Sequence, residues 1–287
     1  MARTLEPYQL VERSIITKYR KVLWNPFIEA VKRYEMIQPG DRIAVCISGG
    51  KDSMLLAKLM QQLQKHSDFP FELVFLVMDP GYNELNRQKI ESNAVLLNIP
   101  VTIFESDIFE VADSAGKSPC YLCARMRRGY LYSRAQELGC NKIALGHHFN
   151  DVVETTLISM FYGSQLQAML PKLHSTNFKG MTLIRPLYCV HEDDIIAWAH
   201  DNSLEFIQCA CHLTERSAAD TGDVNVSKRK EIKLLLRRLR QGNPNIEKSI
   251  FNSIHAVALD TMPGFKTGGV EHSFLERFNA MESTEDE

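Results

Sequence analysis

The sequence lacks the features that mark membrane, secreted and repetitive proteins. It has no uninterrupted apolar stretch of membrane-spanning length. Its opening residues, MARTLEPYQLVERS, carry an early glutamate and no apolar core, which argues against a signal peptide. It has no internal repeat, and only the acidic end MESTEDE has a composition with little reason to fold. We therefore expect a cytoplasmic globular protein that does not associate with membranes.

Neither sign of charge predominates, since the formal net charge is −2. A global basic signal for nucleic acid is absent, so any polyanion must bind to a local patch. The chain has seven cysteines. In a reducing compartment, cysteines are buried, catalytic or metal-bound more often than paired in a disulfide framework.

Strand-like and helix-like stretches alternate along most of the chain. Continuous apolar strands followed by helices indicate an α/β fold, with a parallel sheet and helices on both faces. We expect a helical N-terminal extension over 1–36, the core over 37–202 and a helical C-terminal extension over 203–287. The predicted strands are 41–47, 71–78, 99–106, 141–147 and 181–187, and the predicted helices of the core are 53–63, 83–97, 121–138, 151–161 and 192–201.

The stretch CISGGKDSMLL lies between the first predicted strand and the first predicted helix. Open parallel sheets bind ligands at the carboxyl ends of their strands. Glycines let backbone amides approach a phosphate, and the helix N-terminus and Lys51 add positive charge. The carboxylate of Asp52 would repel a phosphate unless a cation intervened, which implies Mg²⁺. The residues expected to form this phosphate site are Ser48, Gly49, Gly50, Lys51, Asp52 and Ser53.

Two common phosphate-binding motifs, the Walker loop and the G-x-G-x-x-G fingerprint, do not fit this stretch. The string SGGKDS instead resembles the PP-loop of ATP pyrophosphatases, which hold the pyrophosphate end of ATP and transfer AMP to a carbonyl oxygen. The resemblance implies catalytic roles for Lys51 and Asp52. It also implies that Met78, Gly146 and Asp151 border the nucleotide. For the neighbouring histidines 147 and 148, ATP contact and a satisfied pair at a strand end are equal alternatives.

Cys120 and Cys123 lie at the start of a predicted helix, in PCYLCARMRRGYLY. Their spacing brings both sulfurs to one side of the helix, and nearby arginines favour thiolates. A third cysteine would come from Cys209 or Cys211. A zinc site completed by His212, an iron–sulfur cluster with one open iron, and a redox pair are the alternatives that the residues leave open.

Four stretches together are similar to the tRNA 2-thiocytidine synthetase family: SGGKDS, CYLCARMRRGYLY, ELGCNKIALGHHFNDVVETTLISMFYG and IRPL. The resemblance implies an enzyme that adenylates a base carbonyl of tRNA and replaces the oxygen with sulfur. It implies a [4Fe-4S] cluster on Cys120, Cys123 and Cys211, with Cys209 as the competing third ligand. It also implies a cysteine desulfurase or a sulfide pool as the sulfur source. A homodimer is one candidate assembly.

A tRNA needs a local basic surface, and the stretch SKRKEIKLLLRRLRQG offers one. Basic residues form one stripe of this predicted helix and apolar residues form another. The alternative is a solvated face without a partner. The candidate RNA-binding residues are Lys233, Arg237 and Arg240 on this helix, with Arg125 and Arg128 near the cysteines. Rival functions are a PP-loop enzyme acting on another RNA base or a small molecule, and a regulatory protein that binds ATP and metal without catalysis.

Overall fold

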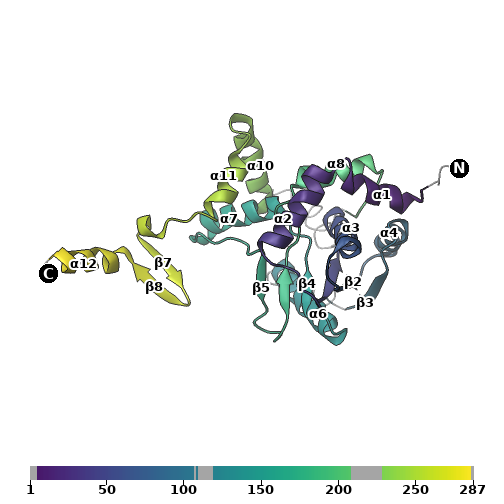
Figure 1. Ribbon diagram of the computed structural model, residues 1–287, viewed down its shortest axis with the longest axis horizontal. Coiled ribbons are helices and arrows are strands. Elements are labelled where there is room, and N and C mark those ends of the chain that lie inside the picture. Colours follow the sequence, from purple (N-terminus) through teal and green to yellow (C-terminus); the bar gives the residue numbers. More distant parts are fainter. Residues whose placement is uncertain (1–4, 107, 109–118, 208–227, 286–287) are drawn as a thin grey trace. The chain divides into compact units, whose positions relative to one another are not determined.

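The computed structural model of the protein describes residues 5–106, 108, 119–207 and 228–285 (Figure 1). For residues 119–125 and 280–285 it describes the backbone alone. The chain forms two compact units, 1–233 and 234–287, which are described separately.

Within the described residues, the central sheet of the first unit holds six strands in the order β3-β2-β1-β4-β6-β5. All neighbouring pairs run parallel except β5 and β6, so the predicted α/β fold is confirmed with one antiparallel edge strand added. The sequence did not reveal β5, because its three residues include a single apolar side chain. The strands are β1 (Arg42–Ile47), β2 (Glu72–Asp79), β3 (Val101–Glu105), β4 (Lys142–Ala144), β5 (Lys172–His174) and β6 (Thr182–Ile184).

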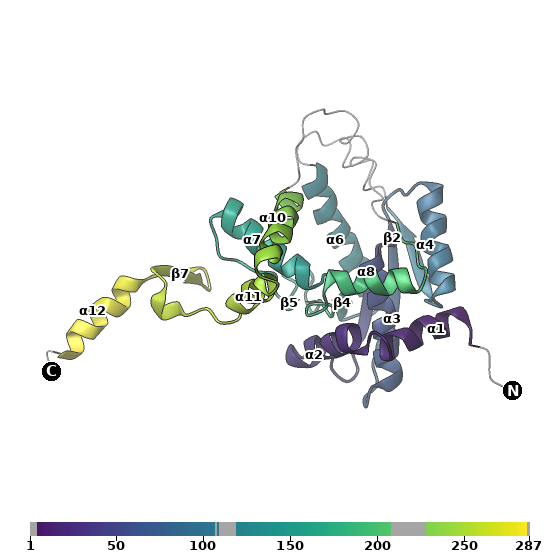
Figure 2. The same cartoon turned by 90° about the horizontal axis from the view of Figure 1, so that it is seen from above.

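Helices cover both faces of this sheet. On β1, the side chains of Ala44 and Cys46 pack with Tyr132 and Ala135 of α6, while Val45 is buried on the opposite face. Figure 2 shows α6 on one side of the sheet and α3 and α8 on the other. The helices that alternate with the strands are α3 (Lys51–His66), α4 (Glu84–Leu96), α6 (Pro119–Glu137), α7 (Phe149–Gly163) and α8 (Glu192–Asp201), close to the predicted ranges.

The strand order reverses at β1. The chain passes from β1 to β2 on one side, while β4 pairs with β1 on the other, with Val45 aligned to Phe75 and to Ala144. Open α/β sheets bind ligands at such a reversal, outside the carboxyl ends of the strands. The fold therefore places the site between the loop after β1 and the loop after β4.

The N-terminal extension consists of α1 (Pro7–Ile16), the π-helical turn η1 (Arg20–Trp24) and α2 (Asn25–Arg33). We expected one helix here. Pro26, in the first turn of α2, accounts for the boundary between η1 and α2, because proline lacks the amide hydrogen and its ring clashes with the carbonyl four residues earlier. The extension is attached to the core by Glu12, whose Oε1 lies 2.8 Å from Nζ of the fully buried Lys58.

The helix α10 (Lys228–Gly242) crosses the boundary between the two units, and its range matches the predicted basic helix. The second unit continues with α11 (Ile246–Ser253), the short η2 (Leu259–Thr261), a hairpin of β7 (Gly264–Thr267) and β8 (Val270–Ser273), and α12 (Phe274–Glu285). The hairpin was not predicted, although Gly268 and Gly269, with φ of +57° and +84°, form the kind of turn that two-residue hairpins prefer.

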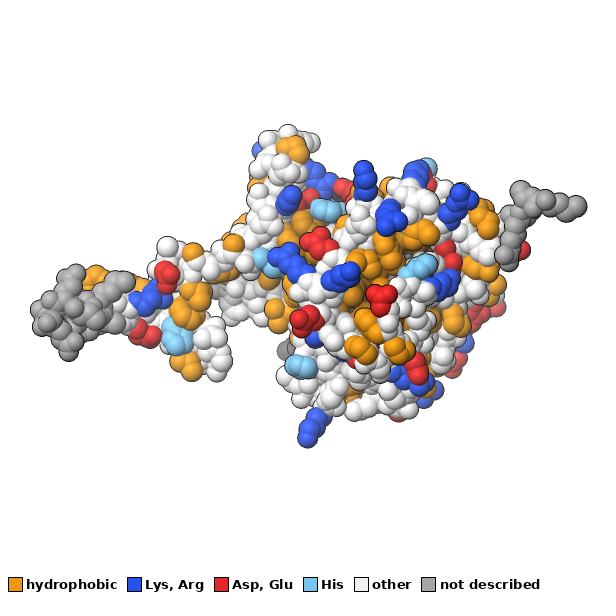
Figure 3. Space-filling view, in the orientation of Figure 1, with side chains coloured by type: hydrophobic (Ala, Val, Ile, Leu, Met, Phe, Trp, Pro, Cys, Tyr) orange, Lys and Arg blue, Asp and Glu red, His pale blue; other side chains and the backbone are white. Residues whose placement is uncertain are grey.

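On the face of the molecule shown in Figure 3, lysine and arginine side chains are interspersed with acidic and apolar ones. Among the described residues, no helix is both long and apolar enough to cross a membrane.

Candidate active site

The glycine loop, residues 48–53, is pre-arranged by hydrogen bonds of its own. The amide of Ser48 donates to Oγ of Ser53 at 3.1 Å, and that hydroxyl donates to the carbonyl oxygen of Gly50 at 2.9 Å. Gly50 is the N-cap of α3 and its side chain offers no cap, so the first amides of the helix need an outside acceptor. A phosphate would supply that acceptor, and the helix dipole favours its charge.

Gly49 is required by the backbone and by its neighbours. Its φ is +83°, which favours glycine, and a Cβ there would lie 2.5 Å from Cγ1 of Ile90. Gly146, in the loop after β4, is equally close to the glycine loop, because a Cβ there would lie 3.1 Å from the amide nitrogen of Ser53. The two loops therefore meet backbone to backbone at the start of α3.

Lys51 lies between two carboxylates. Its Nζ is 3.2 Å from Asp52 and 3.1 Å from Oε1 of Glu192, the first residue of α8. Burial alone would lower the pKa of Lys51, but Asp52 and Glu192 outweigh burial and raise it. Burial would likewise raise the pKa of Glu192, but Lys51 and Lys233 lower it to about 2. Both groups are charged at neutral pH.

Glu192 was missed by the sequence analysis. Its position after the last parallel strand, in the first turn of a helix, places it at the same edge of the sheet as the glycine loop. That position was a readable signal, but nothing in the sequence showed that the side chain would reach Lys51.

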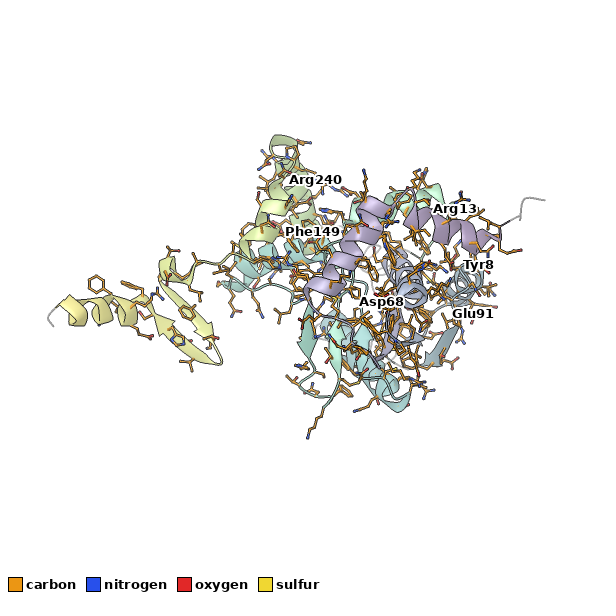
Figure 4. All side chains as sticks on the ribbon, in the orientation of Figure 1. Tyr8, Arg13, Asp68, Glu91, Phe149 and Arg240 are labelled. Atoms are coloured by element: carbon orange, nitrogen blue, oxygen red, sulfur yellow. The ribbon has the colours of Figure 1, made fainter. Side chains whose placement is uncertain are left out.

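The two histidines after β4 have different environments. His148 is the N-cap of α7, where its ring accepts from the amide of Asp151 and its own amide donates to Oδ2 of Asp151 at 3.0 Å. The side chain that follows it, Phe149 (labelled in Figure 4), packs its ring 4.1 Å from that of His191. His148 therefore orders the start of α7, and its Nε2 also lies 3.9 Å from carboxylate oxygens of Asp52 and Glu192.

His147 instead faces a cavity, and among the described residues its buried Nδ1 has no hydrogen-bond partner. Burial, and then the cation of Arg185, lower the pKa of His147 to about 4, so the ring is neutral at neutral pH. An unpartnered ring nitrogen aimed at a cavity favours ligand contact over a satisfied pair.

This cavity, the nucleotide cavity, has a volume of about 310 Å³. Six of the residues predicted to bind the nucleotide line it, and Arg127 and Leu131 of α6 form another wall. The six are Ser48, Asp52, Ser53, Met78, Gly146 and Asp151.

Asp79, the last residue of β2, does not line this cavity. Its carboxylate accepts hydrogen bonds from the amides of Gly81 and Tyr82 and pairs with Arg87 at 3.0 Å.

The first turns of α10 are attached to this site by ion pairs. Nζ of Lys233 lies 3.0 Å from Oε2 of Glu192 and 3.6 Å from Oε1 of Glu154. Arg229 lies 3.1 Å from Oδ1 of Asp151 and 3.4 Å from Oε2 of Glu154. Lys233 therefore pairs with acidic residues of the protein itself. A lysine on a basic surface open to RNA would not have such partners.

The other residues of the predicted RNA surface are scattered. Arg240 pairs with Glu247 at 2.6 Å within the second unit, Arg237 is exposed, and Arg128 is exposed on α6 beside a different cavity. The side chain of Arg125 lies outside the described ones.

The predicted cluster ligands lie largely outside the described residues. Cys120 and Cys123 fall in the first turns of α6, where the backbone alone is described, and Cys209 and Cys211 fall in 208–227. The side chains that are described form no group of three metal-binding residues. The helical i, i+3 placement of the first two cysteines fits two ligands on one side of a cluster.

Three other cysteines are free thiols with no sign of metal binding. Burial raises the pKa of Cys46 to about 12 and that of Cys189 to about 11. Burial raises the pKa of Cys140 as well, and Cys46 and Cys140 are buried in the sheet core. Thiols of this kind stay protonated and pack as small apolar side chains.

Comparison with known proteins agrees with this geometry. Residues 17–215 match the PP-loop domain family. Two relatives named tRNA-cytidine(32) 2-sulfurtransferase, from Geobacter metallireducens and Geobacter sulfurreducens, are 35% and 36% identical to the chain, and each match covers 83% of this chain and 90% of the relative.

Among solved structures, the U34-tRNA thiolase NcsA from Methanococcus maripaludis, determined with its [4Fe-4S] cluster, is similar in fold. It superposes with a TM-score of 0.62 at 19% identity, over 84% of this chain and 80% of that one. The fold, the loop geometry and the extent of identity lead to one conclusion: the chain belongs to the PP-loop family and, within it, to the tRNA-cytidine(32) 2-sulfurtransferases.

Proposed function

We propose that the protein is an ATP-dependent tRNA-thiolating enzyme that converts a cytidine of tRNA to 2-thiocytidine. The observation that carries the proposal is the pre-arranged glycine loop at the strand reversal, facing the nucleotide cavity, in a chain whose relatives bear the name of that activity. In this reading the loop amides and Lys51 hold the pyrophosphate end of ATP, and Met78, Gly146 and Asp151 border the rest of the nucleotide.

The first step forms a bond between the carbonyl oxygen of the base and the α-phosphorus of ATP. The bond from that phosphorus to the bridging oxygen breaks, and pyrophosphate leaves with the electron pair. Lys51 and the amides at the start of α3 stabilise the charge that builds on pyrophosphate. Asp52 is the residue that would hold Mg²⁺, which supplies further charge neutralisation when bound.

The second step replaces oxygen by sulfur. A sulfur nucleophile attacks the adenylated carbon, and AMP leaves with the former carbonyl oxygen. Cys120, Cys123 and Cys211 would hold a [4Fe-4S] cluster, whose fourth iron supplies a place for a small sulfur ligand. We further propose that a cysteine desulfurase or sulfide donates the sulfur and that the protein is cytoplasmic. The proposed tRNA contacts are Arg125, Arg128 and Arg237. A homodimer stays a candidate assembly.

The pairing of Lys51 with Glu192 suits this chemistry. Because the carboxylates already restrict the side chain of Lys51, it loses less conformational freedom on binding a phosphate than an unrestrained lysine would. Glu192 also accepts a hydrogen bond from Lys233. The lysine proposed to hold ATP and a lysine in the first turns of α10 therefore contact the same carboxylate.

The test is pyrophosphate release and nucleoside mass spectrometry with anaerobic protein, ATP, a sulfide source and tRNA. We expect tRNA-dependent pyrophosphate and 2-thiocytidine from the wild type. We expect Lys51→Ala to lower turnover at least about 100-fold in a variant that is still folded by circular dichroism, since Lys233 continues to pair with Glu192. Lys65→Ala, on the exposed end of the same helix, is the matched control. Full turnover by Lys51→Ala would overturn the proposal.

A further inference from the structure

A second cavity, of about 640 Å³, lies along another face of α6, and its lining residues take no part in the two chemical steps. Its lining includes Arg128 and Tyr132 of α6, His174 of β5 and Arg185, just after β6. Its volume lies within the range of about 300–1,000 Å³ that is typical of small-molecule sites. We call it the arginine cavity.

The arginine cavity and the nucleotide cavity are neighbours. Arg127 and Leu131 line the nucleotide cavity, while Arg128 and Tyr132, the residues that follow each of them, line the arginine cavity. Each pair is spaced i, i+4, so two adjacent stripes of one helix face the two cavities. Arg185 lines the arginine cavity, yet its charge lowers the pKa of His147 in the other.

Among the described residues, the arginine cavity carries positive charge without an acidic residue in its lining. Its lining includes two arginines and no acidic residue, and among the described residues neither Arg128 nor Arg185 forms an ion pair. Arg185 donates to the carbonyl oxygen of Leu170, but its buried Nε has no hydrogen-bond partner within the described part of the chain. Burial, and then Arg128, lower the pKa of Arg185 to about 10. A bound anion would offset this electrostatic cost.

The rest of the lining suits a nucleotide better than a bare anion. Tyr132 is buried and stacks on the half-buried Phe178, with ring centroids 5.0 Å apart and planes at 8°, so the pair forms a fixed apolar wall of the cavity. The loop after β5 is ordered by its own hydrogen bonds: the amide of Ser175 donates to Met181, and the amide of Phe178 donates to Oγ of Ser175. Ser175, Thr176 and Asn177 add polar groups beside this wall that can exchange hydrogen bonds with a base or a sugar.

We propose that the arginine cavity binds a nucleotide of the RNA substrate that flanks the reacting base, with its phosphate held by Arg128 and Arg185. The inference rests on the proposed function, which brings an RNA strand to the neighbouring cavity. Arginine is the residue best suited to grip a phosphate with two parallel hydrogen bonds. Arg128 is exposed, so a phosphate can reach it without any rearrangement of the core.

The test compares Arg128→Ala with Arg134→Ala, a half-buried arginine six residues further along the same helix that pairs with Glu137 and lines neither cavity. We expect Arg128→Ala to raise the Kd for tRNA about tenfold and to reduce the slope of log K against log salt by about 0.7–0.9, the value for one lost phosphate contact. The KM for ATP and the melting temperature should not change. Arg134→Ala should behave as the wild type.

A second measurement identifies the phosphate. An RNA hairpin that carries the target cytidine is made with a single neutral methylphosphonate at each linkage near that base. We expect one linkage at which the neutral group weakens binding to the wild type about tenfold and does not weaken binding to Arg128→Ala any further. The absence of any such linkage would overturn the assignment.

The outcomes separate this inference from the proposed function. A wild type that thiolates tRNA, together with an Arg128→Ala variant of unchanged affinity and salt slope, overturns the inference alone. Weaker ATP or pyrophosphate binding by Arg128→Ala would make the cavity a site for free phosphates, and the RNA assignment would be wrong. A wild type that releases no pyrophosphate with tRNA overturns the proposed function and this inference with it.

Discussion

At the scale of single residues, Gly49 shows how little freedom the glycine loop has. Its positive φ, +83°, and its approach to Ile90 and Ile207 act together, since a Cβ would lie 2.5 Å from the first and 2.7 Å from the second. Either neighbour would have to move, and both belong to packed parts of the first unit.

We therefore expect Gly49→Ala to lower the free energy of unfolding by about 1–3 kcal/mol, because an alanine at positive φ is strained and must also displace a neighbour. ATP affinity should fall as well, since the loop amides would no longer converge. The measurements are chemical denaturation and ATP titration. The control is Gly129→Ala, where a Cβ meets nothing within 4 Å. Equal effects of the two substitutions would contradict the steric argument.

At the scale of elements, the buried Glu154 of α7 lies where α10 meets that helix, 3.4 Å from Arg229 and 3.6 Å from Lys233. Burial raises the pKa of Glu154 to about 7 against the opposing effect of Lys233 and Arg229. Between pH 4.5 and 7 the folded protein therefore binds more protons at this site than the unfolded chain does. By linkage, the contribution of Glu154 to stability is present below pH 4.5 and is lost as the pH rises through 7.

We expect Glu154→Gln to remove this part of the pH dependence. The midpoint of urea unfolding should fall less between pH 5 and pH 7.5 in the variant than in the wild type, whatever the shape of the full profile. Glu231→Gln, an exposed acid at the start of α10, is the control. A wild-type difference that Glu154→Gln fails to reduce would show that another group titrates in this range.

The N-terminal extension depends on a different buried pair. Lys58 is fully buried, and its Nζ contacts Glu12 at 2.8 Å and the carbonyl oxygen of Leu97 at 2.7 Å. Removing one partner of a buried ion pair leaves the other charge uncompensated.

We expect Glu12→Ala to lower the free energy of unfolding by about 3 kcal/mol. The exposed pair of Glu29 and Arg33, 3.8 Å apart, gives the comparison, and Glu29→Ala should cost less than about 1 kcal/mol. Chemical denaturation of both variants decides the matter. If Glu12→Ala were as stable as Glu29→Ala, then Lys58 would not depend on its carboxylate partner.

At the scale of the whole molecule, the proposed sulfur transfer would use a metal group held by cysteines that are far apart in the sequence. Three thiolates leave one iron of a [4Fe-4S] cluster open, whereas structural zinc takes four protein ligands and gives a colourless protein. The alternatives therefore differ in colour, in metal and in the cysteines they need.

We expect anaerobically prepared protein to be brown and to lose iron and inorganic sulfide in Cys120→Ala, Cys123→Ala and Cys211→Ala. Cys209→Ala should keep both, and so should Cys189→Ser, the half-buried free thiol. Metal analysis and visible absorbance are the measurements. Loss in Cys209→Ala but not in Cys211→Ala would make Cys209 the third ligand. Stoichiometric zinc without sulfide in active protein would rule out the cluster.

The α/β fold and the position of the glycine loop could both be predicted from the sequence. Both are local in origin: apolar runs bounded by glycine specify strands, and SGGKDS between a strand and a helix specifies a phosphate site wherever the rest of the chain goes. The sequence could not reveal β5, because a three-residue edge strand is held by its neighbour β6 and not by its own composition.

Tertiary structure alone decided which charges meet. Glu192 and Lys233 are far from Lys51 in sequence, yet one carboxylate contacts both amines. The same holds for Arg128 and Arg185, which come from different elements to line one cavity. Sequence periodicity places a side chain on a face of its own helix, but it carries no information about the element on the other side. That pairing is fixed by the order of strands in the sheet and by the long-range packing that follows from it.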